Sequence, residues 1–180
     1  MHRVSAERMG FVSWVASNEE ATAFMAETIL VIDDDPAMLD FLMQRLSPEG
    51  FTISTAGSAQ DGINQAIIRQ PDLILLDLRM PVRDGVTVCK AIRANTKTQH
   101  IPIIVVTGVL LPSQLGEALT AGADDFVSKP VDLTDLMIRI RAMLECRTIE
   151  DRVERFARYT EIAREAASKD SRLHPPTGKD

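Results

Sequence analysis

Three short runs of consecutive apolar residues limit what this chain can fold into. They lie at residues 29–32, 73–76 and 102–106. A strand with one face in water alternates apolar and polar residues, whereas an unbroken apolar run is covered on both faces. Strands of that kind belong to a parallel sheet with helices on each side. The three runs therefore predict a layered α/β fold.

Two weaker strand candidates, at 51–55 and 125–128, bring the expected number of strands to five. Apolar residues at helical spacing separate these candidates. Two helices are expected to begin near Asp35 and Ser58, and three more are predicted at 84–94, 112–121 and 132–145. Because parallel strands are joined by right-handed crossovers, this alternation predicts an α/β, doubly wound, five-stranded parallel sheet with strand order 2-1-3-4-5.

The first two helices carry recognisable start signals. Pro36 is expected in a first turn, where a missing backbone N–H removes no hydrogen bond, and Asp35 before it is an expected N-cap. Ser58, followed by Asp61 three residues later, resembles a capping pair. These signals support the predicted starts of both helices.

Acidic residues directly follow two of the predicted strands. Asp33, Asp34 and Asp35 come after the first strand, and Asp77 comes after the third. In a doubly wound sheet, ligands bind at the carboxyl ends of the strands, beside the point where the strand order reverses. Carboxylates in one crevice repel one another unless a cation is bound, and oxygen ligands suit Mg²⁺. The pattern predicts a magnesium site, although Asp35 also fits an ordinary helix cap.

A hydroxyl and an ammonium group follow the last two strands. Thr107 ends the fourth strand, and Lys129 follows the fifth. Donors that converge on a carboxylate describe a site for an anion with several oxygens, because each donor balances phosphoryl charge. The expected anion is a phosphoryl group on Asp77 itself, formed by nucleophilic attack of its carboxylate. Either residue alone is also common on an ordinary protein surface.

Taken in order, these motifs resemble the response-regulator receiver family over residues 28–145. The matching stretches are ILVIDDDP at 29–36, DLILLDLRMP at 72–81 with DG at 84–85, IIVVTG at 103–108 and AGADDFVSKP at 121–130. As a set with this order and spacing, the motifs are specific to the family. The resemblance implies a flavodoxin-like fold of five β-α units.

The resemblance also implies a role for each acidic residue. Asp77 would be the phosphoacceptor, and Asp34, Asp77 and the backbone carbonyl of Arg79 would bind Mg²⁺. Asp33 would support the ion, mostly through water. Magnesium is therefore the expected cofactor of this chain.

Residues after the fourth and fifth strands would bind the phosphoryl group and report its presence. By the resemblance, Thr107 and Lys129 would hold the phosphoryl oxygens, and the bond from Lys129 to Pro130 is commonly cis. Phe126 takes the position of the switch aromatic, where tyrosine is frequent, so Thr107 and Phe126 form the expected switch. Phe126 equally fits a core phenylalanine in an edge strand. Val131 replaces the aromatic residue often found at its position.

The implied function is that of a two-component response regulator. It would accept a phosphoryl group from the phosphohistidine of a histidine kinase or a phosphotransfer protein, and it would lose the group slowly by self-hydrolysis. The chain is then a signal carrier and not an enzyme. One alternative is a pseudo-receiver that is never phosphorylated and serves as a protein-binding module. Another is a haloacid-dehalogenase-like phosphohydrolase, but its pattern needs an aspartate where this chain has Arg79.

Composition limits the expected partners and compartment. A formal charge of −6 argues against a nucleic-acid surface, which needs concentrated positive charge. The longest apolar run, at 101–111, is shorter than the roughly 18 residues that span a bilayer, and the N-terminus lacks the pattern of a secretory signal. Cys89 and Cys146 are too few for a disulfide framework. We therefore expect a cytoplasmic protein without a membrane or nucleic-acid partner.

Extensions are expected on both sides of the domain at 28–145. Residues 1–27 form an N-terminal extension whose capping pattern allows a short helix. Residues 146–170 are charged and typical of a helix, and residues 171–180, with Pro175 and Pro176, are typical of a flexible tail.

The segment at 146–168 also carries an apolar 3,4 spacing, which begins at Cys146 and ends at Ala167. If helix 132–145 continued through this seam, it would form a stalk about 55 Å long. Val153 and Phe156 would then pair two chains as a parallel homodimer. The alternative is a solvated helix that folds back on its own domain.

Overall fold

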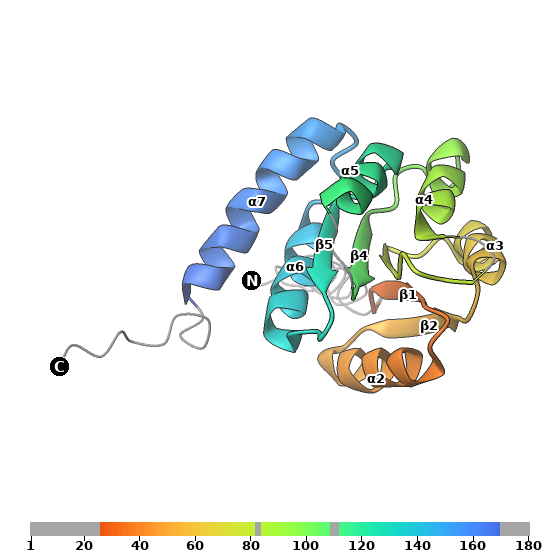
Figure 1. The fold of residues 1–180 in the computed structure, drawn as a ribbon. Helices are drawn as coiled ribbons and strands as arrows, with labels where there is room; N and C mark the ends of the chain where they lie inside the picture. The colour runs from red at the N-terminus through yellow and green to blue at the C-terminus, as the bar shows by residue number, and fades with distance from the viewer. Residues whose placement is uncertain (1–25, 82–83, 109–111, 170–180) are drawn as a thin grey trace, which may run out of the picture.

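A computed structural model describes residues 26–81, 84–108 and 112–169 of the chain. Its elements, in order, are β1 (Thr28–Ile32), α2 (Pro36–Leu46), the 3-10 turn η1 (Ser47–Glu49), β2 (Thr52–Ala56), α3 (Ala59–Arg69), β3 (Leu73–Leu76), α4 (Gly85–Ala94), β4 (Ile103–Thr107), α5 (Pro112–Ala121), β5 (Asp125–Ser128), α6 (Leu133–Glu145) and α7 (Arg152–Lys169). The strands form one parallel sheet in the order β2-β1-β3-β4-β5, with helices on both faces (Figure 1). The predicted fold class and strand order are confirmed.

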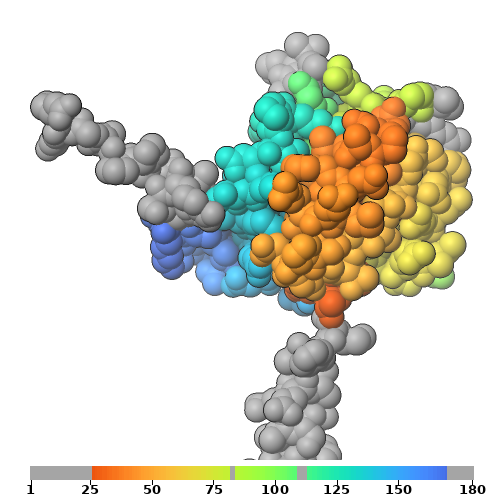
Figure 2. Space-filling model, turned by 90° about the horizontal axis from the view of Figure 1, so that it is seen from below, coloured from red at the N-terminus to blue at the C-terminus, as the bar shows by residue number. Residues whose placement is uncertain are grey.

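The sheet separates two apolar layers. Leu30 and Ile32 of β1 point to one layer, which includes residues of α3, α4 and α5. Ile29 and Val31 point to the other layer, where residues of α2 and α6 pack. Figure 2 shows α2 in orange on the surface, with α6 in cyan beside it. Both faces of the inner strands are thus covered, which explains why their sequences are apolar without alternation.

The predicted helix starts are confirmed by hydrogen bonds. The carboxylate of Asp35 accepts from the backbone N–H of Ala37 at 2.9 Å, and Pro36 occupies the first turn of α2. The hydroxyl of Ser58 accepts from the backbone N–H of Asp61 at 3.2 Å. Each side chain pairs one of the N–H groups that a helix start leaves without an internal partner.

The continuous stalk expected from 132 to 168 is wrong. Helix α6 ends at Glu145, and residues 146–151 separate it from α7. The carboxylate of Asp151 starts α7 by accepting hydrogen bonds from the backbone N–H groups of Val153 and Glu154, both at 2.9 Å. Helix α7 then runs back along α6 and past β5 (Figure 1). The structure therefore has the folded-back arrangement that the sequence left as the alternative.

The apolar 3,4 spacing at 146–168 led to a wrong prediction of a stalk, because the residues at these positions do not share one environment. Ile149 packs against the core, whereas Val153 and Phe156 are 80% and 56% exposed. The buried positions of α7 are instead Arg155 and Tyr159, which are 2% and 3% exposed. Polar groups of His100 and Asp125 pair with these two side chains and so permit their burial. The parallel homodimer stays a prediction, without a continuous stalk to support it.

Two predicted segments lie largely or wholly outside the described residues. Only Ala26 and Glu27 of the expected extension at 1–27 are described, and none of the expected tail at 171–180 is. Among the helices of the described ranges, none has both the length and the apolar character needed to cross a membrane.

Candidate functional site

The acidic residues meet because β1 and β3 are paired neighbours. Ile32 lies opposite Leu76 in the parallel register, so the residues that follow, Asp33 and Asp77, leave the sheet side by side. The backbone N–H of Asp77 donates to the carbonyl of Ile32 at 2.8 Å and holds the two strand ends together. Asp33, Asp34 and Asp77 offer carboxylate oxygens within 4.8 Å of one another. The predicted acidic cluster is therefore present at the carboxyl edge of the sheet.

Lys129 reaches this cluster from the end of β5. Its ammonium lies 2.6 Å from an oxygen of Asp33 and 3.4 Å from an oxygen of Asp77. Burial alone would lower the pKa of Lys129, but the hydrogen bond and charge of Asp33, together with the charge of Asp77, raise it. The peptide bond from Lys129 to Pro130 is cis, as the resemblance implies. The site thus holds a fixed positive charge beside two carboxylates.

Asp77 is almost enclosed, with 5% of the residue exposed. Burial raises its pKa above the ordinary value; Lys129 opposes that rise, and the nearby charge of Asp33 adds to it. The backbone N–H of Arg79 donates to one carboxylate oxygen at 3.0 Å, while the other oxygen faces Lys129. A cation among these carboxylates would favour their ionised forms. The all-oxygen donor set therefore fits a hard divalent ion such as Mg²⁺.

Thr107 stands out because its buried hydroxyl has no hydrogen-bond partner among the described residues. The residue is fully buried at the end of β4, between β3 and β5 in the sheet. An unpaired buried hydroxyl costs free energy, so its presence calls for an explanation such as a catalytic or ligand-binding role. Thr107 is where the sequence predicted a group that binds an anion.

Two features of the site were missed by the sequence analysis. A β-carbon at Gly85, the first residue of α4, would lie 2.5 Å from the backbone oxygen of Asp77 and 2.8 Å from the Cα of Leu78. Only glycine allows α4 to start this close to the acidic residue. A β-carbon at Gly108 would lie 3.4 Å from the guanidinium of Arg79, so this side chain reaches over the end of β4. The Asp-Gly motif at 84–85 was a signal for the glycine at the start of α4. No local pattern predicts the contact between Arg79 and Gly108.

The remaining predicted residues lie at the margin of the site. Asp34 is exposed at the mouth of the acidic cluster. Phe126 is partly buried in β5, where it pairs with Val105 and packs against the layer that contains α3, α4 and α5. This position, between core and surface, is compatible with either predicted role of Phe126.

The fold and the acidic site together define a receiver-type signalling domain, and comparison with known proteins agrees. Residues 29–141 match the family described as the response regulator receiver domain. This match covers more than half of the chain, so the chain belongs to that family. It carries the receiver domain of a two-component response regulator.

Relatives with known names or structures share this domain. The DNA-binding dual master transcriptional regulator RpaA of Synechocystis is 38% identical over 134 residues, which are 74% of this chain and 54% of that protein. A CheY-like receiver domain from Methanospirillum hungatei has a TM-score of 0.65 and 30% identity, with 71% of this chain and 100% of that chain covered.

A third relative is the receiver domain of a sensor histidine kinase from Pseudomonas aeruginosa, solved with a magnesium ion coordinated in its active-site cleft. Its TM-score is 0.63 at 26% identity, with 67% of this chain and 99% of that chain covered. The curated relatives are longer proteins. This chain spans 54% of RpaA and 28% of the regulator PleD from Caulobacter vibrioides.

Proposed function

We propose that Asp77 accepts a phosphoryl group from the phosphohistidine of a histidine kinase or a phosphotransfer protein, and that this modification switches the signalling state of the chain. One observation carries the proposal. The ammonium of Lys129 bridges the carboxylates of Asp77 and Asp33, at the same sheet edge as the hydroxyl of Thr107, which has no partner among the described residues. A nucleophile, a fixed cation and a free donor at one edge are the groups that transfer of a phosphoryl group requires.

The proposed reaction exchanges one bond for another at phosphorus. A carboxylate oxygen of Asp77 forms the new P–O bond, while the P–N bond to the donor histidine breaks and its electron pair returns to the imidazole. Lys129 and Thr107 would donate to the phosphoryl oxygens. Lys129 already lies 3.4 Å from Asp77, so a small movement away from Asp33 would bring its ammonium to those oxygens. Such a movement couples the reaction to the conformation of β5.

Mg²⁺ is the cofactor that the donor set favours. Asp34, Asp77 and the backbone carbonyl of Arg79 would hold the ion, with Asp33 supporting it mostly through water. When bound, the ion would balance charge on the transferred group. The magnesium-bound receiver domain from Pseudomonas aeruginosa supports this part of the proposal.

The proposal makes this chain a signal carrier and not an enzyme that acts on other substrates. The Arg79 side chain near Gly108 offers no general base to a water molecule, so we expect slow self-hydrolysis. The net charge of −6 gives the chain no evident surface for DNA, although RpaA is named as a DNA-binding protein. Two buried free cysteines are consistent with a cytoplasmic location.

Labelling of the Asp77→Asn variant tests the proposed function. With acetyl phosphate and Mg²⁺, the wild-type chain should gain a base-labile acyl phosphate, and Asp77→Asn should gain none. Asp40→Asn is a matched control, because Asp40 is an exposed carboxylate on α2. Undiminished labelling of Asp77→Asn would contradict the assignment. An unlabelled wild-type chain would instead favour the pseudo-receiver alternative.

A further inference from the structure

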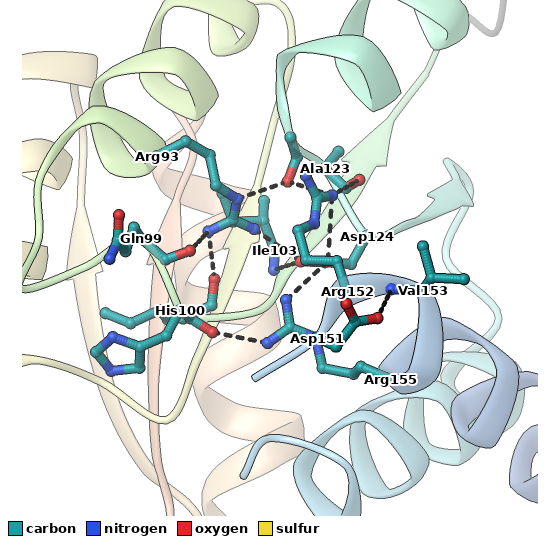
Figure 3. Close-up of polar contacts among 12 residues, drawn as sticks. Arg93, Gln99, His100, Ile103, Ala123, Asp124, Asp151, Arg152, Val153 and Arg155 are labelled. Carbon is teal, nitrogen blue, oxygen red and sulfur yellow. Dashed lines mark hydrogen bonds and ion pairs between the residues drawn. The ribbon is translucent and has the colours of Figure 1, made fainter. Parts of the chain in front are cut away.

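Helix α7 is held against Asp124, the residue before β5, by ion pairs. The carboxylate of Asp124 receives three guanidinium groups: Arg93 of α4 at 2.8 Å, Arg155 of α7 at 3.3 Å and Arg152 of α7 at 3.4 Å (Figure 3). Arg155 is only 2% exposed and also donates to the backbone carbonyl of His100 at 2.9 Å. Arg155 and the carboxylate of Asp124 thus hold the helix from within the protein, whereas the Arg152 side chain stays 44% exposed.

A second anchor lies one helical turn further along α7. The hydroxyl of Tyr159 donates to the carboxylate of Asp125, the first residue of β5. Arg139 of α6 donates to the same carboxylate at 2.6 Å. Because residues four apart lie on one face of a helix, Arg155 and Tyr159 bind the successive residues Asp124 and Asp125, the second of which begins β5. The geometry of each contact therefore depends on the position of β5.

The strand β5 joins these anchors to the acidic site. Asp125 begins the strand, and Lys129 directly follows its last residue, Ser128. The four residues of β5 pair with β4 along their whole length. A displacement of the Lys129 backbone would therefore act through a short, regular strand on the residues that α7 binds. Phe126 lies within the same strand, so it would move with it.

Polar anchors make α7 sensitive to such a displacement. Hydrogen bonds weaken steeply with distance and angle. A buried guanidinium that loses its carboxylate also becomes unfavourable, because its charge is no longer balanced. A shift of β5 would therefore loosen the contacts of Arg155 and Tyr159.

We propose that α7 is a latch on β5: docked α7 stabilises the phosphoryl-free arrangement of the site, and phosphorylation of Asp77 loosens α7. This inference rests on the proposed phosphorylation of Asp77. Phosphoryl oxygens draw Lys129 away from Asp33, and β5 then shifts against the anchors at Asp124 and Asp125. The coupling is reciprocal, so weakening an anchor strengthens binding of a phosphoryl group by the same factor by which the phosphoryl group weakens the anchor.

Beryllofluoride, an anion that mimics a phosphoryl group on a carboxylate, provides the test with the full chain and Mg²⁺. Hydrogen exchange followed by mass spectrometry should show faster exchange in α7 when beryllofluoride is bound. By titration calorimetry, Arg155→Met and Tyr159→Phe should bind beryllofluoride about 5- to 50-fold more tightly than wild type, within the usual range of allosteric coupling. Tyr159→Phe removes one hydroxyl only, so it tests the latch even if Arg155→Met does not fold.

Arg158→Met is the matched control, since Arg158 lies on the same helix and its ion pairs, with Glu161 of α7 and Glu145 of α6, are both exposed and so contribute little. It should bind beryllofluoride with wild-type affinity. If wild type binds the anion but α7 exchange does not change, or if Tyr159→Phe binds no more tightly, the latch is overturned while the proposed function stands. If wild type binds no beryllofluoride, the proposed function fails, and the latch fails with it.

Discussion

The ammonium of Lys129 lies 2.6 Å from an oxygen of Asp33, closer than the 3.4 Å that separates it from Asp77. The lysine is thus paired mainly with the neighbour of the proposed phosphoacceptor. Because Asp33 is almost fully buried, this pair balances a charge that water cannot reach. A phosphoryl group on Asp77 would compete with Asp33 for the lysine, and this competition would give the site a second arrangement.

Lys129→Ala should separate metal binding from switching. The three carboxylates remain, so Mg²⁺ should bind at least as tightly as in wild type because a competing positive charge is lost. Beryllofluoride with Mg²⁺ should then fail to change hydrogen exchange in β5 and α7. Magnesium titration and hydrogen exchange of the same variant check both parts. A wild-type exchange response would show that Lys129 does not read the phosphoryl group.

Thr107→Val should weaken binding of a phosphoryl mimic without lowering the free energy of unfolding. Valine keeps the shape of threonine and removes the buried hydroxyl that has no partner among the described residues. We expect the free energy of unfolding to be unchanged or to rise by about 1 kcal/mol, and beryllofluoride to bind about tenfold more weakly. Urea unfolding and titration calorimetry measure the two effects, with Thr107→Ser as the control that keeps the hydroxyl. Equal affinity in Thr107→Val and wild type would exclude the proposed role of the hydroxyl.

Gly85→Ala should damage the site through the backbone. The added methyl group would lie 2.5 Å from the backbone oxygen of Asp77, so the start of α4 must move. We expect a loss of about 1–3 kcal/mol in the free energy of unfolding and weaker labelling by acetyl phosphate. Gly116→Ala in α5 is the control, because its β-carbon would meet no atom within 4 Å, and it should stabilise the protein by about 0.5–1 kcal/mol. Similar effects of both substitutions would argue against a special constraint at Gly85.

Asp124→Asn should destabilise the folded chain strongly. Three guanidinium groups share this carboxylate, and that of Arg155 is buried. Loss of one partner from a buried ion pair costs about 3–5 kcal/mol. Glu49→Gln breaks the exposed pair with Arg141 and should cost less than about 1 kcal/mol. Denaturant unfolding compares the two, and equal losses would show that burial of the cluster contributes little.

The thiol of Cys89 should be protected and should add a pH-dependent contribution to stability. Burial raises its pKa from 9.0 to about 12. Since the folded pKa is the higher one, this contribution is fully present below pH 9.0 and is lost as the pH rises toward 12. Relative to Cys89→Ala, wild type should lose stability only above pH 9.0, as measured by unfolding at several pH values. Iodoacetamide at pH 7.5 should label Cys89 in urea but not in the native protein; native labelling would contradict its burial.

The fold and the acidic residues of the candidate site could be predicted from local sequence patterns. Unbroken apolar runs mark strands covered on both faces, and this property depends only on local composition. The helix caps at Asp35 and Ser58 are likewise local, and both were predicted correctly. The meeting of Asp33 with Asp77 followed from topology, because parallel neighbours end at the same edge of the sheet.

The position of α7 and the pairing of the buried charges depend on long-range contacts, which local sequence patterns do not contain. Arg155 and Tyr159 have the pattern of a solvated helix face, and only contact with Asp124 and Asp125 makes their burial favourable. The preference of Lys129 for Asp33 depends likewise on distances between segments far apart in the chain. Burial and pairing energies arise from such long-range contacts, so one-dimensional spacing cannot distinguish a stalk from a helix folded back on its own domain.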